Sequence, residues 1–183
     1  MEPDTTDELG IGEQGEVCAS GPGLMMGYYN NQEATDEIIK VHPDGQRWIH
    51  LGDLGKIDED GKLHITGRIK RIVMTKGSDG NVTKMFPDRI EKAIQRCEDV
   101  ELACVIGVKD EERIHYPKAI IELKDKTKDQ DKVREAILKV CKENLPDYQV
   151  PDVIEFVDEL PRTPRGKVDY RVLEESDIKP ADS

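Results

Sequence analysis

The sequence predicts an α+β fold: a small sheet with packed helices in its second half, preceded by a β-rich segment. In the second half, two amphipathic helical patterns alternate with β-branched runs, as in a sheet that carries helices. The first third has short strand-like runs and turn signals but no obvious core helix. We therefore expect two parts, residues 1–66 and residues 67–183, with the boundary near residues 67–70.

The start of the chain is expected to form one strand and one short helix. Residues 16–20 have a strand-like composition and are followed by the turn signal Gly21-Pro22-Gly23. Thr35 is expected to cap a helix that ends near Lys40, because a threonine hydroxyl can accept a hydrogen bond from a free amide at a helix start.

Further strands and a hairpin are predicted before the boundary. Residues 48–51 are strand-like, and residues 54–58 and 62–66 are predicted to form a hairpin. Its turn is Asp60-Gly61, a dipeptide that adopts positive φ angles at low cost. Residues 68–76 combine basic and apolar side chains and are predicted to form one more strand.

Two helices are predicted from apolar stripes with a spacing of three and four residues. The stripes consist of Ile90, Ala93, Ile94 and Cys97, and of Val133, Ile137, Val140, Cys141 and Leu145. Pro146 should end the second helix, because its ring cannot continue the backbone hydrogen bonding. Strands are expected at residues 100–108, 118–123 and 153–157, and a short last helix from Asp169.

The composition disfavours several classes of function. The chain has 183 residues, a net charge of −12 at pH 7 and only 4% aromatic residues, which argues against nucleic-acid binding by charge or by base stacking. No apolar run approaches the ~20 residues that a membrane-spanning helix requires. No signal peptide is visible, so we expect a cytoplasmic protein.

The cysteines and histidines do not predict a metal site. The four cysteines lack the close spacing of metal ligands, and the four histidines show neither a helical pair nor a third ligand. We therefore expect no metal ligands among the candidate site residues, and we expect the cysteines to act as small apolar side chains in a reducing compartment.

Lys167 is one candidate site residue. It follows Gly166 in a loop rich in proline, arginine and threonine, where a glycine lets the backbone turn and a lysine can project its charge into a cleft. Such a cation can stabilise phosphate charge that grows in a transition state. Judged on this loop alone, a solvated surface lysine is the simpler interpretation.

Asp53 and two basic residues that follow it are further candidates. Asp53 comes after a strand-like run and Gly52, where a carboxylate can accept hydrogen bonds from both hydroxyls of a ribose, although a turn aspartate is commoner. Arg68 and Lys70 could bind a phosphate or simply line an edge strand exposed to water.

Taken in order, these segments resemble the adenylate-forming, or AMP-binding, superfamily of acyl-CoA synthetases, peptide-synthetase adenylation domains and luciferases. Residues 15–29 resemble its Gly-Glu-Leu…Gly-Tyr segment, and His50-Leu51-Gly52-Asp53 resembles its Tyr-Arg-Thr-Gly-Asp motif. Gly67-Arg68-Ile69-Lys70 matches the Gly-Arg-x-Asp/Lys hinge motif, and residues 161–169 are close to the Pro-Arg-Thr-x-x-Gly-Lys ending. Four matches in this order are jointly specific, whereas one alone would not be.

The resemblance implies a domain organisation and roles for five residues. Residues 1–66 would complete the large N-terminal domain, and residues 67–183 would form the mobile C-terminal lid. The implied roles are adenylation for Lys167, ribose binding for Asp53, nucleotide contact for Arg68, the pivot for Lys70 and the thiol-acceptor loop for Gly77.

The implied activity is that of an AMP-forming acyl-CoA ligase, with a carboxylic acid, ATP, Mg²⁺ and coenzyme A. Lys167 would bridge carboxylate and phosphate oxygens while an acyl adenylate and pyrophosphate form. The lid would then rotate about Lys70 and bring residues 67–77 to the site, where a thiol attacks. The main nucleotide pocket is not in this sequence, so we expect the chain alone to be inactive and to need the missing N-terminal domain as its partner.

The thiol acceptor and the acid stay open. Leu51 replaces the threonine of its motif, and extra polar residues follow Gly77, which alters the acceptor loop. An adenylation domain that loads a phosphopantetheinyl carrier protein is therefore one alternative. A non-catalytic α+β module that binds a partner protein is another, from a different class. The acyl pocket lies mostly outside this sequence, which predicts neither the acid nor the oligomeric state.

Overall fold

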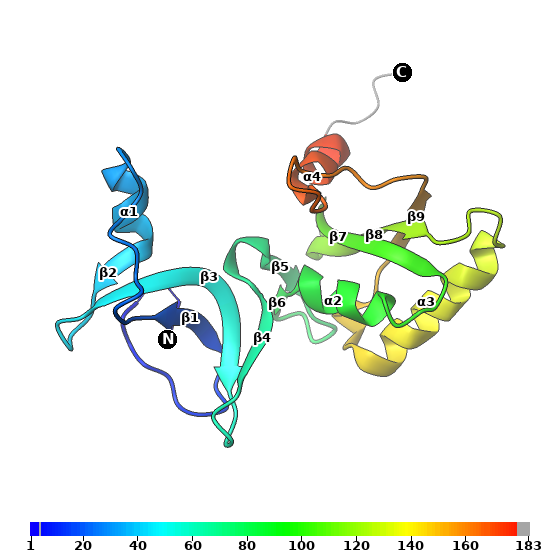
Figure 1. The fold of residues 1–183 in the computed structure, drawn as a ribbon. Coiled ribbons are helices and arrows are strands. Elements are labelled where there is room, and N and C mark those ends of the chain that lie inside the picture. The colour runs from blue at the N-terminus through cyan, green and yellow to red at the C-terminus, as the bar shows by residue number, and fades with distance from the viewer. Residues whose placement is uncertain (4, 179–183) are drawn as a thin grey trace. The chain divides into compact units, whose positions relative to one another are not determined.

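The computed structural model describes residues 1–3 and 5–178, which form two compact units that divide between Lys70 and Arg71 (Figure 1). The division falls at the residue expected to be the pivot, slightly later than the predicted boundary between residues 66 and 67. The assignment of these units to the domains of the resembled family stays a prediction. No helix within residues 1–3 and 5–178 is long and apolar enough to cross a membrane.

The first unit is an antiparallel sheet around one long strand, β3. Its strands are β1 (Gly15–Ala19), β2 (Ile39–Val41), β3 (Arg47–Ile57) and β4 (Leu63–Arg68). The two strands predicted at residues 48–51 and 54–58 are one strand, because Gly52, with a φ of 68°, carries it through a shift of register against β1. The predicted turn is confirmed by the φ of 77° at Gly61.

Helix α1 (Gln32–Ile38) begins earlier than predicted, so the prediction that Thr35 caps it was wrong. The N-cap is Asn31, whose side chain accepts a hydrogen bond from the Ala34 amide at 3.0 Å. Thr35 lies buried inside the helix; its hydroxyl donates to the Asn31 carbonyl at 2.8 Å and accepts from the Tyr28 amide at 2.9 Å. Asn31 therefore takes the cap position that the sequence assigned to Thr35.

Residues 68–76 do not form the single strand that was predicted. β4 ends at Arg68, one turn of 3₁₀-helix follows as η1 (Ile69–Arg71), and β5 (Val73–Lys76) comes next. The segment divides because its two ends pair with different partners: β4 pairs with β3, whereas β5 pairs with β6 (Val82–Met85), a strand that the sequence did not predict.

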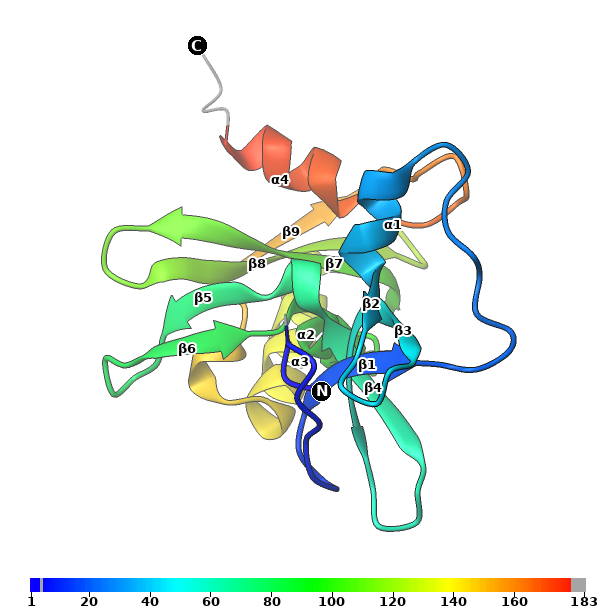
Figure 2. The same ribbon diagram turned by 90° about the vertical axis from the view of Figure 1, so that its left-hand side faces the viewer.

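The second unit contains a sheet with helices on both faces. Its strands, in the order β7–β8–β9, are β7 (Val100–Asp110), β8 (Ile114–Leu123) and β9 (Val153–Val157). Helices α2 (Pro87–Ile94) and α3 (Gln130–Asn144) cover one face, and α4 (Tyr170–Ile178) covers the other (Figure 1; Figure 2). The short turn η2 (Asp147–Gln149) follows α3. The predicted α+β class is confirmed, with a helix on the second face in addition.

Alternation along the central strands divides the core between these faces. Ala103 and Val105 point toward α2 and α3, whereas Cys104 and Ile106 belong to the cluster under α4. Both predicted helical stripes are confirmed by burial of their main members, which are Ile90, Ala93, Ile94, Val133, Ile137 and Cys141. Helix α3 ends at Asn144 with Leu145 as its C-cap, directly before Pro146, which confirms the predicted end of this helix.

Candidate active site

Asp53 and Arg68 face each other on neighbouring strands of the first unit. They are register partners in the β3–β4 pair, and the Nε atom of Arg68 lies 3.3 Å from Oδ1 of Asp53. The side chains are 33% and 59% exposed, so the pair contributes little to stability and both groups remain accessible to a polar ligand. A carboxylate accepts hydrogen bonds from hydroxyls and a guanidinium donates to oxygens, which fits a ribose and phosphate ligand.

A buried network braces the strand beside Asp53. Glu16 Oε2 lies 2.8 Å from His50 Nδ1, and Glu16 Oε1 accepts a hydrogen bond from the Gly52 amide at 3.2 Å. His50 Nε2 in turn lies 3.0 Å from Nε2 of His42, and the three side chains are buried. The network thus fixes the backbone directly before Asp53. The sequence reasoning missed it, because only the pairing of β1 with β3 brings Glu16 and His50 together.

Cys18 lies beside Glu16 and His50 of this network. Among the described residues, donor atoms of Glu16, Cys18 and His50 lie within 4.8 Å of one another, a grouping that the sequence did not predict. Burial, together with the charge of Glu16, raises the pKa of the Cys18 thiol to about 11. The hydrogen bond between Glu16 and His50, together with the pairing of Cys18 with His50 in the β1–β3 register, accounts for the approach of these atoms, and we interpret the cluster as a structural network.

Lys167 lies at the end of a tight turn in the second unit. The Gly166 amide donates to the Thr163 carbonyl at 2.8 Å and the Thr163 amide donates to the Lys167 carbonyl at 2.7 Å. Arg162 and Val168 pair as a β-bridge at the base of this turn. Gly166 has a φ of 77°, a conformation that glycine adopts without strain. The turn therefore fixes the backbone of Lys167 while its side chain remains exposed to solvent.

Gly77 begins the turn of the β5–β6 hairpin. Its amide donates to the Asn81 carbonyl at 2.9 Å, and its carbonyl accepts from the Gly80 amide at 2.9 Å. Asp79 stabilises the turn by accepting from the Asn81 amide at 3.0 Å. A Cβ atom at Gly77 would lie 2.9 Å from Asp79 Oδ1, so a larger residue there would have to displace the Asp79 carboxylate. The extra polar residues noted in the sequence are thus the tip of a hairpin.

The five predicted site residues are divided between the two units. Asp53, Arg68 and the exposed Lys70 belong to the first unit, whereas Gly77 and Lys167 belong to the second. Asp53 and Arg68 are in contact with each other, whereas each of the other three residues is described only by its surroundings in its own unit. Their functional roles stay predictions.

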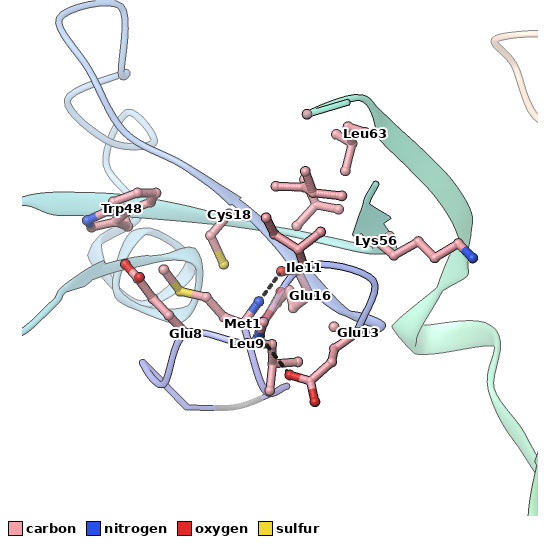
Figure 3. Close-up of a pocket in the computed structure, with 16 residues that line it drawn as sticks. Met1, Glu8, Leu9, Ile11, Glu13, Glu16, Cys18, Trp48, Lys56 and Leu63 are labelled. Carbon is pink, nitrogen blue, oxygen red and sulfur yellow. Dashed lines mark hydrogen bonds between the residues drawn. The ribbon is translucent and has the colours of Figure 1, made fainter. Parts of the chain in front are cut away.

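A pocket of about 330 Å³ in the first unit is separate from these residues. Figure 3 shows that the N-terminal segment, with Leu9 and Ile11, lines it together with strand residues such as Cys18 and Leu63. None of the predicted site residues lines this pocket. Glu16 and Cys18, which lie beside His50, are also part of its lining.

Comparison with known families and curated proteins supports the resemblance. Residues 89–167 match the family described as AMP-binding enzyme C-terminal domain. The chain is 35% identical over 170 residues to a long-chain-fatty-acid–CoA ligase of Salmonella typhimurium, covering 93% of this chain and 28% of that protein. It is 32% identical over 173 residues to 4-coumarate–CoA ligase-like 1 of Arabidopsis thaliana, covering 94% of this chain and 30% of that protein. The chain thus spans about 30% of the length of the curated relatives it matches.

Solved structures agree with the fold. The amide bond synthetase McbA from Marinactinospora thermotolerans is similar with a TM-score of 0.79 and 29% identity, over 96% of this chain and 33% of that one. The anthranilate CoA ligase AuaEII in complex with anthranoyl-AMP is similar with a TM-score of 0.77 and 28% identity, over 92% of this chain and 31% of that one. The chain therefore belongs to the AMP-binding, adenylate-forming enzymes, and it corresponds to the C-terminal portion of such an enzyme.

Proposed function

We propose that this chain supplies the adenylation lysine and part of the nucleotide site of an ATP-dependent, AMP-forming acyl-CoA ligase. The observation that carries the proposal is the turn that holds Lys167 inside the region matched by the C-terminal domain family. The accessible Asp53–Arg68 pair in the first unit supports it, because these residues would contact the ribose and phosphate of the nucleotide. Several curated relatives are named as CoA ligases, in agreement with this activity.

In the first half-reaction, a carboxylate oxygen attacks the α-phosphorus of Mg-ATP and the bond to pyrophosphate breaks. Negative charge is shared among the carboxylate, phosphate and leaving-group oxygens as this happens. The turn would fix the backbone from which the Lys167 side chain reaches the site, and its ammonium would stabilise that charge. Asp53 would fix the ribose, which orients the α-phosphate for attack.

In the second half-reaction, the thiol of coenzyme A attacks the acyl carbonyl and AMP leaves. A rotation at Lys70 would withdraw Lys167 from the reaction site and bring in the β5–β6 hairpin, whose turn begins at Gly77. The polar hairpin tip is the feature of this chain most directly concerned with the choice of acceptor. A phosphopantetheinyl carrier protein is the alternative acceptor, and one similar structure is an amide bond synthetase, so amines also belong in the test.

The test is acid-dependent pyrophosphate release by the full-length protein that contains this chain. We expect release with Mg-ATP and a suitable carboxylic acid, and formation of a thioester when coenzyme A is added. A panel of acids, each tried with coenzyme A, a holo carrier protein and an amine, separates the acceptors. Absence of acid-dependent pyrophosphate release across a broad panel would favour a module that binds a partner protein instead.

The chain by itself is expected to be inactive, because the remaining nucleotide and acid contacts would come from the N-terminal portion of the enzyme. Assay of the 183-residue chain with ATP and the same acids tests this expectation. The mass of the native protein in a cell extract, read with an antibody against this chain, shows whether the two portions form one polypeptide. The cytoplasmic location expected from the sequence is part of the same proposal, and cell fractionation with that antibody tests it.

A further inference from the structure

Arg71, the first residue of the second unit, makes a dense set of interactions. Its side chain is only 11% exposed, and its guanidinium forms a fork with the Glu91 carboxylate, with Nη1–Oε2 and Nη2–Oε1 distances of 3.0 and 2.7 Å. Nη1 also donates to Asp88 Oδ1 at 2.6 Å. A fork of this kind fixes the orientation of the guanidinium plane as well as its charge.

The same guanidinium and its partner bind the central sheet. Nη2 of Arg71 donates to the Val105 carbonyl at 3.0 Å, and Glu91 Oε1 accepts from the Val105 amide at 2.8 Å. Arg71 therefore ties η1 to helix α2 and strand β7 at once. Burial alone would lower the pKa of Arg71, but the hydrogen bond and charge of Glu91 raise it, so the guanidinium stays charged.

A third contact leads to the segment that carries Lys167. The Cζ atom of Arg71 lies 4.9 Å from the ring centroid of Tyr170, a distance typical of a cation–π interaction. Tyr170 is the first residue of α4 and follows Lys167 by three positions, and it packs, as Val168 does, against the apolar cluster under that helix. The amide of Asp169 donates to the Pro161 carbonyl at 2.7 Å, which closes the base of the loop.

We propose that Arg71 is a positioning residue for Lys167: it joins the residue after the pivot to the base of the loop that carries the lysine. The inference rests on the proposed function and adds a residue to it. Because the guanidinium contacts α2, β7 and Tyr170 together, rotation at Lys70 moves the Lys167 loop with the rest of the second unit. Without this contact the loop keeps its turn, but its base is held less firmly against η1.

The control is Arg113, which has the same two kinds of partner elsewhere in the second unit. Its Nη1 atom donates to both Asp152 carboxylate oxygens at 3.0 and 3.2 Å, and its guanidinium lies 5.5 Å from the Tyr116 ring centroid. Its side chain is 44% exposed, and neither partner belongs to the loop that carries Lys167. Arg113→Met therefore removes an arginine–carboxylate and cation–π pair without touching the proposed connection.

The experiment measures two half-reactions in the full-length enzyme: acid-dependent pyrophosphate release, and thioester formation from supplied acyl adenylate. We expect Arg71→Met and Tyr170→Leu each to lower kcat for pyrophosphate release by about ten- to a hundredfold, as for a misplaced catalytic group. The KM for ATP and the rate from supplied adenylate should change far less. Arg113→Met should match the wild type, and Arg71→Lys should recover part of the loss.

Two further results decide between positioning and simple stabilisation. If Arg71 acts through Tyr170, the double variant Arg71→Met, Tyr170→Leu should lose no more activity than the stronger single variant. The reason is that both substitutions remove the same contact. Tyr170→Leu leaves Arg71 paired with the carboxylates of Asp88 and Glu91. It therefore tests the positioning role even if Arg71→Met folds poorly. Wild-type pyrophosphate release in Tyr170→Leu, or a loss equal to that of Arg113→Met, would overturn the inference. Absence of pyrophosphate release in the wild type would instead overturn the proposed function.

Discussion

The Oδ1 atom of Asp53 lies 3.3 Å from the Nε atom of Arg68 on the adjacent strand, and both side chains remain accessible to solvent. An exposed pair of this kind is worth at most about 1 kcal/mol, so it is poorly explained as a source of stability. Under the proposed function, the pair contributes to binding of the nucleotide instead.

The first prediction concerns this pair. Asp53→Asn in the full-length enzyme should raise the KM for ATP by about tenfold or more, because hydrogen bonds to a charged acceptor contribute about 1.5–3 kcal/mol. The melting temperature should stay close to that of the wild type. The control is Asp60→Asn, which removes a carboxylate from an exposed pair with Lys62 in the same unit. Equal KM values for both variants would contradict the nucleotide-binding role.

The second prediction concerns the buried brace behind Asp53. Glu16→Ala removes the partner of His50 and of the Gly52 amide, and should destabilise the protein by about 1–3 kcal/mol through unsatisfied buried groups. It should also raise the KM for ATP, because the backbone before Asp53 is no longer fixed. Urea unfolding and the ATP dependence of pyrophosphate release check the two effects. A stability loss without any change in KM would show that the brace does not position Asp53.

The third prediction uses two glycines with the same backbone conformation. Gly166 and Gly61 both have a φ of 77° and open space where a Cβ would lie, so alanine adds only backbone strain, about 1–2 kcal/mol at each position. Both variants should lose similar stability in urea unfolding. Only Gly166→Ala should lower pyrophosphate release strongly, because its strain acts on the turn of Lys167. Equal activity in the two variants would show that this turn does not position a reacting group.

The fourth prediction concerns pH. Burial, followed by the nearby Glu91, raises the pKa of the Cys104 thiol to about 12, and burial raises that of Cys141 to about 11. An unfolded cysteine has a pKa of about 8.5, so these thiols stabilise the fold fully below that pH, and the contribution is lost as pH rises toward 11–12. Stability should therefore fall above about pH 8.5. Rapid labelling of both thiols in the native protein at pH 8 would contradict this burial.

Part of this structure could be predicted from the sequence because it depends on local patterns. Helices α2 and α3 bury one face each, so their apolar stripes appear at helical spacing. The Asp60-Gly61 dipeptide predicts a turn by itself, because glycine adopts a positive φ at low cost. Strands β2 and β6 have three and four residues, too few to show an alternation. They were missed for that reason.

The interactions around the candidate site depend on segments that are distant in sequence. Glu16 and His50 are 34 residues apart, and Arg71 and Glu91 are 20 apart, so no local pattern reveals either pair. In the sequence, Arg71 was one member of a basic run, and its burial could not be predicted before α2 and β7 were placed around it. Lys167 was found only because the order of several motifs resembles a known family.

The most direct test of the account is Lys167→Ala in the full-length enzyme, with the two half-reactions measured separately. Acid-dependent pyrophosphate release should fall by at least about a hundredfold, as when a preorganised charge is removed from a transition state. Thioester formation from supplied acyl adenylate should stay near the wild-type rate, and Lys139→Ala, an exposed lysine on α3, should affect neither step. Equal loss of both half-reactions, or no loss of pyrophosphate release, would contradict the assignment of Lys167 as the adenylation lysine.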